Sequence, residues 1–381
     1  MRVCYFGTYD ETFPRNKALV QGLIENGVQV AVCHARLWSG TDDKISGVRG
    51  LQKKPLSPAF LRRVVGSYLR LLREHRRVDP YDVMLVGYAG HVDMLVAWVL
   101  SRLRRRPLAF DAVLSLHSTI VDERKLVEPG SIVARMFWLL DKVSCSLADL
   151  VFLDTQAHID WFSERYDLPR GRFRRVLTGA EPLGPAEGEP RVDGGPFKVL
   201  YFGSFIPLHG VEHILGAARE LRGEAGIEFH LVGDGQNYEK AQRLAQENNL
   251  SNVHFLRRIF RPSELATSFG NADVCLGHFG TSRVAERVIP QKIAISLAMG
   301  LPVLTRDSPA VREIFSPGQN IMVCQAGDPQ SLAAALLALK ADAALRQSIA
   351  REGHRFYWER LCPGAIGREA KEHLLALCQG R

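Results

Sequence analysis

The sequence predicts an α/β protein made of two doubly wound, Rossmann-like domains. Short apolar segments that suit buried parallel strands alternate with helical segments along the 381 residues. The alternation breaks at residues 179–196, where four prolines and five glycines occur without hydrophobic periodicity. A chain of this length is expected to form two domains of ordinary size. We therefore predict a first domain at 1–180, a linker at 181–196 and a second domain at 197–362.

The first half supplies five expected strands, each short and rich in β-branched or aromatic residues. They are residues 2–6, 29–33, 83–86, 109–116 and 150–153. Parallel neighbours need right-handed helical crossovers between them. The helices that fit this role are residues 15–26, 92–103 and 131–147.

The second half repeats the alternation. Its expected strands are residues 198–202, 228–232, 253–256, 274–276, 303–305 and 321–323. The last helices are expected at 344–358 and 365–377. In sheets of this kind, ligands bind at the carboxyl ends of the strands, so the loops that follow the strands are where functional residues are expected.

Composition excludes several classes of protein. An apolar content of 46% and a charged content of 24% are ordinary for a globular protein. No run of eighteen apolar residues predicts a transmembrane helix, and the first residues suit a strand better than a signal peptide. The seven cysteines are scattered without a Cys-x-x-Cys pair, which favours reduced thiols in the cytoplasm over a structural zinc site.

The positive charge is concentrated in one half of the chain. Residues 1–180 contain 27 Lys and Arg against 19 Asp and Glu, whereas the rest of the chain contains 22 of each. This asymmetry predicts an anionic partner, such as a phospholipid surface, a pyrophosphate-linked acceptor or nucleic acid. No nucleic-acid motif accompanies the basic clusters at 102–106 and 170–175, so nucleic acid is not the expected partner.

Residues 58–77 predict an amphipathic basic helix. Its apolar stripe is formed by Leu61, Val64, Val65, Tyr68, Leu69 and Leu72, and six arginines supply its charge. Such a helix can dock on an anionic membrane surface. It can equally pack on its own domain and leave the charged face in solvent.

An anion site is predicted within residues 269–317. The strand at 274–276 leads into a loop that contains Gly280, and a helix begins near residue 291. Free backbone N–H groups and the helix dipole favour an anion at such a place. The loop and the start of the helix also carry three cations that suit a diphosphate, namely Arg283, Arg287 and Lys292. Lys292 ranks first because it opens the helix, while one or two of the others can be surface charges.

This segment resembles the nucleotide-sugar half of family-4 glycosyltransferases with the GT-B fold. The resemblance rests on GTSRVAERVIPQK followed by SLAMGLPVLTRDSPAVRE, and it extends to VLYFGSFIPLHGVEHIL at 199–215, to HLVGDG at 230–235 and into the first half. It implies two Rossmann-like domains that face each other across a cleft, with a last helix at 363–381 that crosses back onto the first domain.

The resemblance also implies an activity. The protein would be a retaining glycosyltransferase of the hexosyltransferase type that uses a nucleotide-diphosphate sugar. The hydroxyl acceptor would come from a lipid-linked or polysaccharide pathway, and no cofactor or essential metal would be needed. The protein would be cytoplasmic, or peripheral on the inner face of the membrane.

Two departures from the family pattern concern the diphosphate. Relatives usually place an Arg just after the glycine that corresponds to Gly203, and a Lys before the next glycine. Ser204 and His209 stand at these places here. Neutralisation of the leaving group would then move to the cations of the 283–292 segment.

A third departure concerns the nucleotide. Family members carry Glu-x7-Glu, whose second Glu holds the ribose hydroxyls, but Arg287 and Ile295 stand at these places and Glu286 lies one residue away. An isoleucine cannot accept a hydrogen bond. Either the nucleotide is held differently, or donor binding is weak or lost.

The resemblance assigns roles in the first half as well. His117 would face the sugar and phosphate of the donor, and Asp122 would orient an acceptor hydroxyl unless it only pairs with Arg124. The expected catalytic residues are therefore His117 and Asp122. The expected substrate-binding residues are Gly7, Thr8, Arg15, Gly203, Ser204, His209, Arg258, Gly280, Thr281, Arg283, Glu286, Arg287 and Lys292.

Two alternatives stay open. The chain could be a catalytically degenerate GT-B protein that serves as a binding or scaffold subunit, as the altered Glu pair suggests. It could also be a glycosyltransferase that acts on a soluble small molecule or on tRNA, with the basic face used for recognition.

Overall fold

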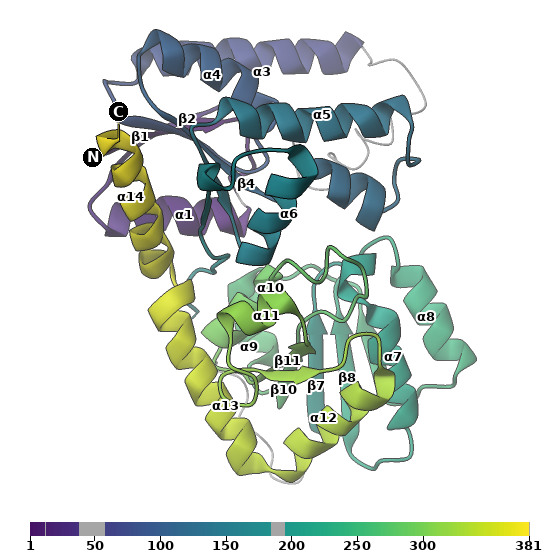
Figure 1. Cartoon of the computed structure of the whole chain (residues 1–381). Helices are drawn as coiled ribbons and strands as arrows, with labels where there is room; N and C mark the ends of the chain where they lie inside the picture. Colours follow the sequence, from purple (N-terminus) through teal and green to yellow (C-terminus); the bar gives the residue numbers. More distant parts are fainter. Residues whose placement is uncertain (12, 38–57, 184–194, 381) are drawn as a thin grey trace. The chain divides into compact units, whose positions relative to one another are not determined.

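The computed structural model describes residues 1–11, 13–37, 58–183 and 195–380. The chain divides into two compact units: unit 1 comprises Met1–Leu177 and Pro363–Arg381, and unit 2 comprises Thr178–Cys362. Each unit is a six-stranded parallel sheet with flanking helices, which confirms the predicted pair of doubly wound, Rossmann-like units (Figure 1). Most of the predicted linker, residues 184–194, lies outside the described part of the chain.

The sheet of unit 1 has the strand order β2-β1-β3-β4-β5-β6. Its strands are β1 (Arg2–Gly7), β2 (Gln29–His34), β3 (Val83–Val86), β4 (Leu108–Val113), β5 (Leu150–Leu153) and β6 (Phe173–Arg175). Every residue of β3, β4 and β5 is buried. This is the pattern of parallel strands that are covered on both faces.

Helices cover both faces of this sheet. They are α1 (Pro14–Glu25), α3 (Pro58–Arg77), α4 (Asp93–Leu103), α5 (Ile132–Leu147), α6 (Gln156–Tyr166) and α14 (Pro363–Gln379), with short turns η1 (Ser118–Glu123) and η2 (Arg170–Arg172). The chain moves from β2 past β1 to β3 and then on to β4 and β5 in the same direction. Because parallel crossovers are right-handed, α3, α4 and α5 lie on one face and α1 on the other, as Figure 1 shows.

The last helix, α14, packs against α1 (Figure 1). Asn26 Nδ2 donates to the carbonyl oxygen of Gly364 at 2.8 Å, and Lys371 Nζ donates to the carbonyl oxygen of Asn26 at 2.8 Å. A Cβ placed on Gly22 would lie 1.9 Å from the carbonyl oxygen of Pro363. The two helices therefore approach too closely for any side chain at this position.

The sheet of unit 2 has the order β12-β11-β10-β7-β8-β9. Its strands are β7 (Phe197–Phe202), β8 (Ile227–Val232), β9 (Val253–Leu256), β10 (Val274–Leu276), β11 (Val303–Arg306) and β12 (Met322–Cys324). Its helices are α7 (Val211–Glu220), α8 (Tyr238–Glu247), α9 (Pro262–Phe269), α10 (Gln291–Ala298), α11 (Pro309–Ile314), α12 (Pro329–Ala341) and α13 (Ala343–Phe356), with η3 (Pro207–His209) and η4 (Tyr357–Leu361).

In unit 1 the structure differs from the prediction at one predicted strand and at one strand that was not predicted. The strand expected at 109–116 ends at Val113, because the following residues turn toward the carboxylate of Asp141, which accepts the backbone N–H groups of Leu116 and His117. The strand Phe173–Arg175 was not predicted, and it forms the edge of the sheet beside β5.

No helix in the described ranges has both the length and the apolar content that crossing a bilayer requires.

Candidate functional site

The candidate site of unit 2 lies where the strand order reverses. The chain runs from β7 to β8 and β9 on one side, and β10 then pairs with the other edge of β7. Ligands of doubly wound sheets bind outside the carboxyl ends of the strands at such a switch point. The turns that follow β7 and β10 contain Gly203 and Gly280, and the first turn of α10 contacts the first of these glycines.

Lys292, in the first turn of α10, is a buried cation of this site. Its Nζ lies 3.9 Å from the centre of the Tyr201 ring, and a Cβ placed on Gly203 would lie 3.2 Å from it. No hydrogen-bond partner for Nζ exists among the described residues. Burial lowers the pKa of the Lys292 amine well below its usual value. A nearby anion favours the charged form of an amine, so this position suits a phosphate.

Two side chains hold the turn after β7 through the carbonyl oxygen of Ser204. Tyr201 Oη donates to the carbonyl oxygen of Ser204 at 2.8 Å, and His209 Nδ1 contacts the same oxygen. A carbonyl oxygen only accepts, so Nδ1 of His209 carries a hydrogen. His209 therefore fixes the turn, and it does not simply replace the lysine that relatives carry at its place.

The loop after β10 is positioned by two buried side chains that sequence reasoning missed. Arg306 Nη1 donates to the carbonyl oxygen of Gly280, and His278 Nε2 donates to the carbonyl oxygen of Ala285 at 3.0 Å. Burial lowers the pKa of His278 to about 3, and the neighbouring Arg306 and Lys292 add to this effect. Arg306 is the last residue of β11 and adds positive charge at the carboxyl end of a third strand. A cation at the end of a predicted strand is the signal by which the sequence could have identified Arg306 as a site residue.

The remaining loop residues divide by exposure. Arg287 is buried, whereas Thr281, Arg283 and Glu286 are exposed. Ile295 is buried within α10, so an apolar side chain occupies the place at which relatives carry the ribose-binding Glu.

Arg258, another predicted substrate-binding residue, lies at the edge of the sheet of unit 2. It follows β9, the edge strand, which β8 separates from β7. Its guanidinium lies 4.4 Å from the centre of the Phe260 ring and 3.9 Å from a carboxylate oxygen of Glu264. Both contacts hold the side chain at the edge of the sheet.

In unit 1, the turn at Gly7 and Thr8 is occupied by a carboxylate of the protein itself. Thr8 donates its backbone N–H to Asp93 Oδ2 at 2.7 Å, and Tyr68 Oη donates to Asp93 Oδ1 at 2.7 Å. A Cβ placed on Gly7 would lie 2.7 Å from Asp93 Oδ2. Asp93 thus accepts the backbone N–H group of the turn at which a role near the donor phosphates was predicted.

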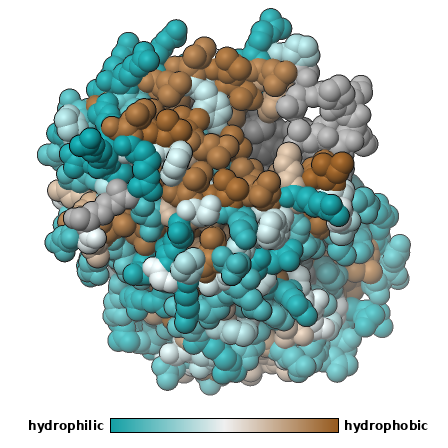
Figure 2. Space-filling view, turned by 45° about the horizontal axis from the view of Figure 1, so that its top comes forward, coloured by the Kyte–Doolittle hydropathy of each residue, from teal (hydrophilic) through white to brown (hydrophobic). Residues whose placement is uncertain are grey.

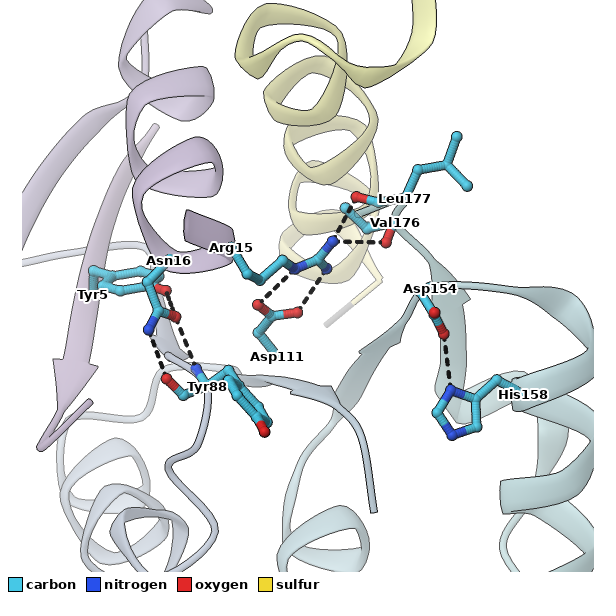
Figure 3. A network of polar contacts seen from close by, with 9 residues as sticks. All are labelled: Tyr5, Arg15, Asn16, Tyr88, Asp111, Asp154, His158, Val176 and Leu177. Atoms are coloured by element: carbon cyan, nitrogen blue, oxygen red, sulfur yellow. Dashed lines mark hydrogen bonds and ion pairs between the residues drawn. The ribbon is translucent and has the colours of Figure 1, made fainter. Parts of the chain in front are cut away.

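Arg15, which was also predicted to contact substrate, makes its contacts within unit 1 (Figure 3). It is 1% exposed and forms a bidentate pair with Asp111 through Nε and Nη2 at 3.0 and 2.8 Å. Its Nη1 donates to the carbonyl oxygens of Val176 and Leu177 at 2.9 and 2.5 Å. Arg15 thus ties the start of α1 to β4 and to the last residues of unit 1 before Thr178.

The two expected catalytic residues lie side by side. His117 Nδ1 is 3.6 Å from Asp122 Oδ2. Burial alone would raise the pKa of Asp122, but the neighbouring imidazole of His117 lowers it below its usual value. Since β4 ends at Val113, His117 does not end the strand as predicted; it precedes η1.

Asp141 positions the segment that carries His117, and no sequence pattern indicated this role. This fully buried carboxylate accepts the N–H groups of Leu116 and His117 at 2.9 Å each, and hydroxyls of Ser115 and Tyr166 at 2.8 and 2.9 Å. Burial would raise its pKa, but His91, whose Nε2 lies 3.2 Å away, and these donors lower it.

The structure thus gathers five predicted residues at one place in unit 2: Gly203, Ser204, His209, Gly280 and Lys292. In unit 1 it pairs His117 with Asp122. Within the described residues, no group of three His, Cys, Asp or Glu side chains is arranged to hold a metal ion.

Comparison with known proteins matches each half of the chain to a glycosyltransferase family. Residues 16–182 match the family described as Glycosyltransferase Family 4, and residues 196–342 match the family described as Glycosyl transferases group 1. The chain is a family-4-like GT-B glycosyltransferase. This confirms the family and the fold that the sequence predicted.

Individual relatives of this glycosyltransferase are distant. An uncharacterized glycosyltransferase of Methanocaldococcus jannaschii is 24% identical over 176 residues, which are 43% of this chain and 45% of that protein. The match therefore spans less than half the length of the curated relative.

Solved structures agree with the fold over nearly the whole chain. HepE from Anabaena, solved with UDP and glucose, shares 15% identity at a TM-score of 0.69, and the alignment covers 99% of this chain and 100% of that one. Sucrose-phosphate synthase from Thermosynechococcus elongatus shares 16% identity at a TM-score of 0.67, covering 100% and 99%.

Proposed function

We propose that this glycosyltransferase binds a nucleotide-diphosphate sugar in unit 2 and transfers the sugar to a hydroxyl acceptor held mainly by unit 1. The observation that carries the donor half is the buried Nζ of Lys292, which lacks a hydrogen-bond partner among the described residues and lies against the Gly203 turn. Anabaena HepE was also solved with UDP and with UDP-glucose. These neighbours make UDP the first nucleotide to test.

Lys292 supplies the charge that family members place at Ser204 and His209. A buried amine without a partner is costly as a cation, so the site without ligand favours the neutral form. A diphosphate at the switch point gives the ammonium an anionic partner. Arg306 and Arg287 add positive charge from the neighbouring strand end and loop.

The proposed transfer proceeds with retention of the anomeric configuration. The bond between the anomeric carbon and the β-phosphate oxygen breaks, and the acceptor oxygen bonds to the carbon from the same face. The hydroxyl proton of the acceptor passes to the leaving phosphate oxygen. Cations at the diphosphate stabilise the charge that develops there, and no metal ion takes part in this scheme.

His117 and Asp122 belong to the acceptor side of the proposal. The imidazole of His117 would donate to a sugar hydroxyl or a phosphate oxygen. Asp122 is half exposed, and its lowered pKa keeps the carboxylate ionised at neutral pH. It can therefore accept a hydrogen bond from the acceptor hydroxyl.

The acceptor class we propose is a lipid-linked or polysaccharide-pathway intermediate. The excess of positive charge in residues 1–180 fits an acceptor with a pyrophosphate or a membrane-bound lipid. In that case the enzyme works as a peripheral protein at the inner face of the membrane. Strong, salt-dependent binding of tRNA, or transfer to a soluble sugar, would instead favour the alternative acceptors.

A thermal-shift screen with UDP, GDP, dTDP, ADP and CMP tests the donor half. A ligand that binds only the folded protein raises its melting temperature by mass action. We expect a selective shift with one nucleotide, and a smaller shift in the Lys292→Ala variant.

One observation favours a second candidate, a GT-B scaffold that no longer binds a donor. Ile295 stands where the ribose-binding Glu is expected, and it is buried and apolar. Absence of a shift with every nucleotide, in a protein that melts cooperatively, would favour this candidate over the enzyme.

A further inference from the structure

One face of unit 1 exposes apolar side chains on three neighbouring helices. Figure 2 shows them as a broad hydrophobic area. We call this area the apolar face. Its exposed members are Leu61, Val65 and Leu69 on α3, Val92, Leu95, Trp98, Val99 and Leu103 on or beside α4, and Ile132, Met136 and Leu139 on α5. Helices α3, α4 and α5 cover the same side of the sheet, and α4 lies between the other two in the strand order.

The apolar face is not needed to cover the sheet. Helix α4 already buries Met94 and Ala97 against the sheet, while Leu95, Trp98 and Val99 point away, with 39–48% of their surface exposed. On α5, the spacing of Ile132, Met136 and Leu139 places these three on one outward stripe. Proteins rarely expose a large contiguous apolar area to water, and such an area marks an interaction surface.

The charges around the apolar face have one sign. Helix α3 exposes six arginines: Arg62, Arg63, Arg70, Arg73, Arg76 and Arg77. Further exposed arginines are Arg102 on α4 and Arg135 on α5. Across these three helices, all of whose residues are described, Asp93 and Asp141 are buried and Glu74 is the one acidic residue that reaches the surface.

We propose that the apolar face docks on an anionic phospholipid bilayer, with α4 at its centre and the arginines of α3 among the lipid phosphates. Apolar side chains backed by basic residues are what binds a helix at the boundary between headgroups and acyl chains. A second copy of the chain fits less well, because a symmetric contact would bring two arginine-rich rims of like charge together. Trp98 is the residue type that favours the interface between apolar and aqueous layers.

Membrane docking would bring the enzyme to a lipid-linked acceptor, and this part of the inference rests on the proposed function. Docking itself requires neither donor nor catalysis. Vesicle binding and nucleotide binding are therefore measured separately on each variant, so that failure of one is distinguishable from failure of the other.

The first test is sedimentation of the full chain with phosphatidylcholine vesicles, with and without phosphatidylglycerol. We expect binding only to the anionic vesicles, weakened by salt. The double variant L95S/V99S should lose about tenfold or more of the affinity, and R73E about fivefold or more. Matched surface changes in unit 2 are I259S and R219E, because Ile259 is 81% exposed and Arg219 is exposed on α7. Both should bind as the wild type does.

The second test reads contact directly. Brominated acyl chains quench a tryptophan that lies at the bilayer, and two tryptophans of the described ranges are similarly exposed: Trp98 at 39% and Trp358 at 49%. The proposal expects W98F to lose the quenching that W358F retains. Equal quenching in both variants, or no binding of the wild type to anionic vesicles, overturns it. A wild-type dimer that L95S/V99S dissociates, without vesicle binding, would assign the face to a second copy and would also overturn it.

Discussion

Replacing Lys292 with methionine should weaken donor binding and stabilise the free protein at the same time. Methionine keeps most of the side-chain volume beside Tyr201 and removes only the amine. A hydrogen bond to a charged group contributes about 1.5–3 kcal/mol. We therefore expect the Kd for UDP to rise about 10- to 100-fold in K292M, since about 1.4 kcal/mol is a tenfold change.

The stability of K292M should change in the opposite direction. The amine is buried without a hydrogen-bond partner among the described residues, and such burial costs about 1–3 kcal/mol. Because the pKa of Lys292 is lowered in the folded state, the unfolded chain binds this proton more strongly. Stability of the wild type should therefore rise with pH between the lowered pKa and about 10.4, the value in the unfolded chain. K292M should lose this slope.

Calorimetric titration with UDP and urea unfolding at neutral and mildly alkaline pH measure both effects. Arg283, an exposed cation of the same loop, supplies the control R283M, whose unfolding free energy should stay within about 0.5 kcal/mol of the wild type. Unchanged UDP affinity in K292M would refute the assignment of Lys292 to the diphosphate. A K292M protein that is less stable than the wild type would refute the argument from burial.

Three further changes test the framework around the site. G22A should lower the melting temperature markedly, because a Cβ there meets the backbone of α14, whereas G66A, with open space around it, should be neutral or slightly stabilising; equal melting temperatures would contradict the close approach. R15M should lower the free energy of unfolding by about 3–5 kcal/mol in urea, since it leaves Asp111 buried without its cation. An almost unchanged free energy would contradict a stabilising role of the Arg15–Asp111 pair. D141N should weaken stability only above about pH 4, because the lowered pKa of Asp141 gives a contribution that disappears as pH falls through it. A constant difference from the wild type at all pH values would contradict that assignment.

The sequence predicted the fold because its strands are buried on both faces. The segment Val83–Val86 is apolar throughout and bounded by Asp82 and Gly87, and the structure has the same bounds. The strand Phe173–Arg175 escaped prediction because two of its three residues are arginines, which an edge strand tolerates. The length of β4 was overestimated because the carboxylate that ends it, Asp141, lies far along the chain.

The sequence indicated those residues of the candidate site whose neighbours in space are also close in the chain. Lys292 was found because a strand, a glycine loop and a helix start adjoin in the chain. The local sequence around Gly7 did not indicate Asp93, because this residue, whose carboxylate contacts the turn, is 86 positions away. The part of the apolar face on α4 and α5 escaped for a different reason: an outward Trp98 on a mostly apolar helix cannot be distinguished by periodicity from a residue in the core.

A crystal structure of the full chain with UDP tests the central claim most directly. We expect the diphosphate at the turn of Gly203, with Lys292 Nζ within about 3 Å of a phosphate oxygen. UDP bound elsewhere, or bound at this turn while Nζ still faces the Tyr201 ring without touching a phosphate, would show that Lys292 does not bind the diphosphate.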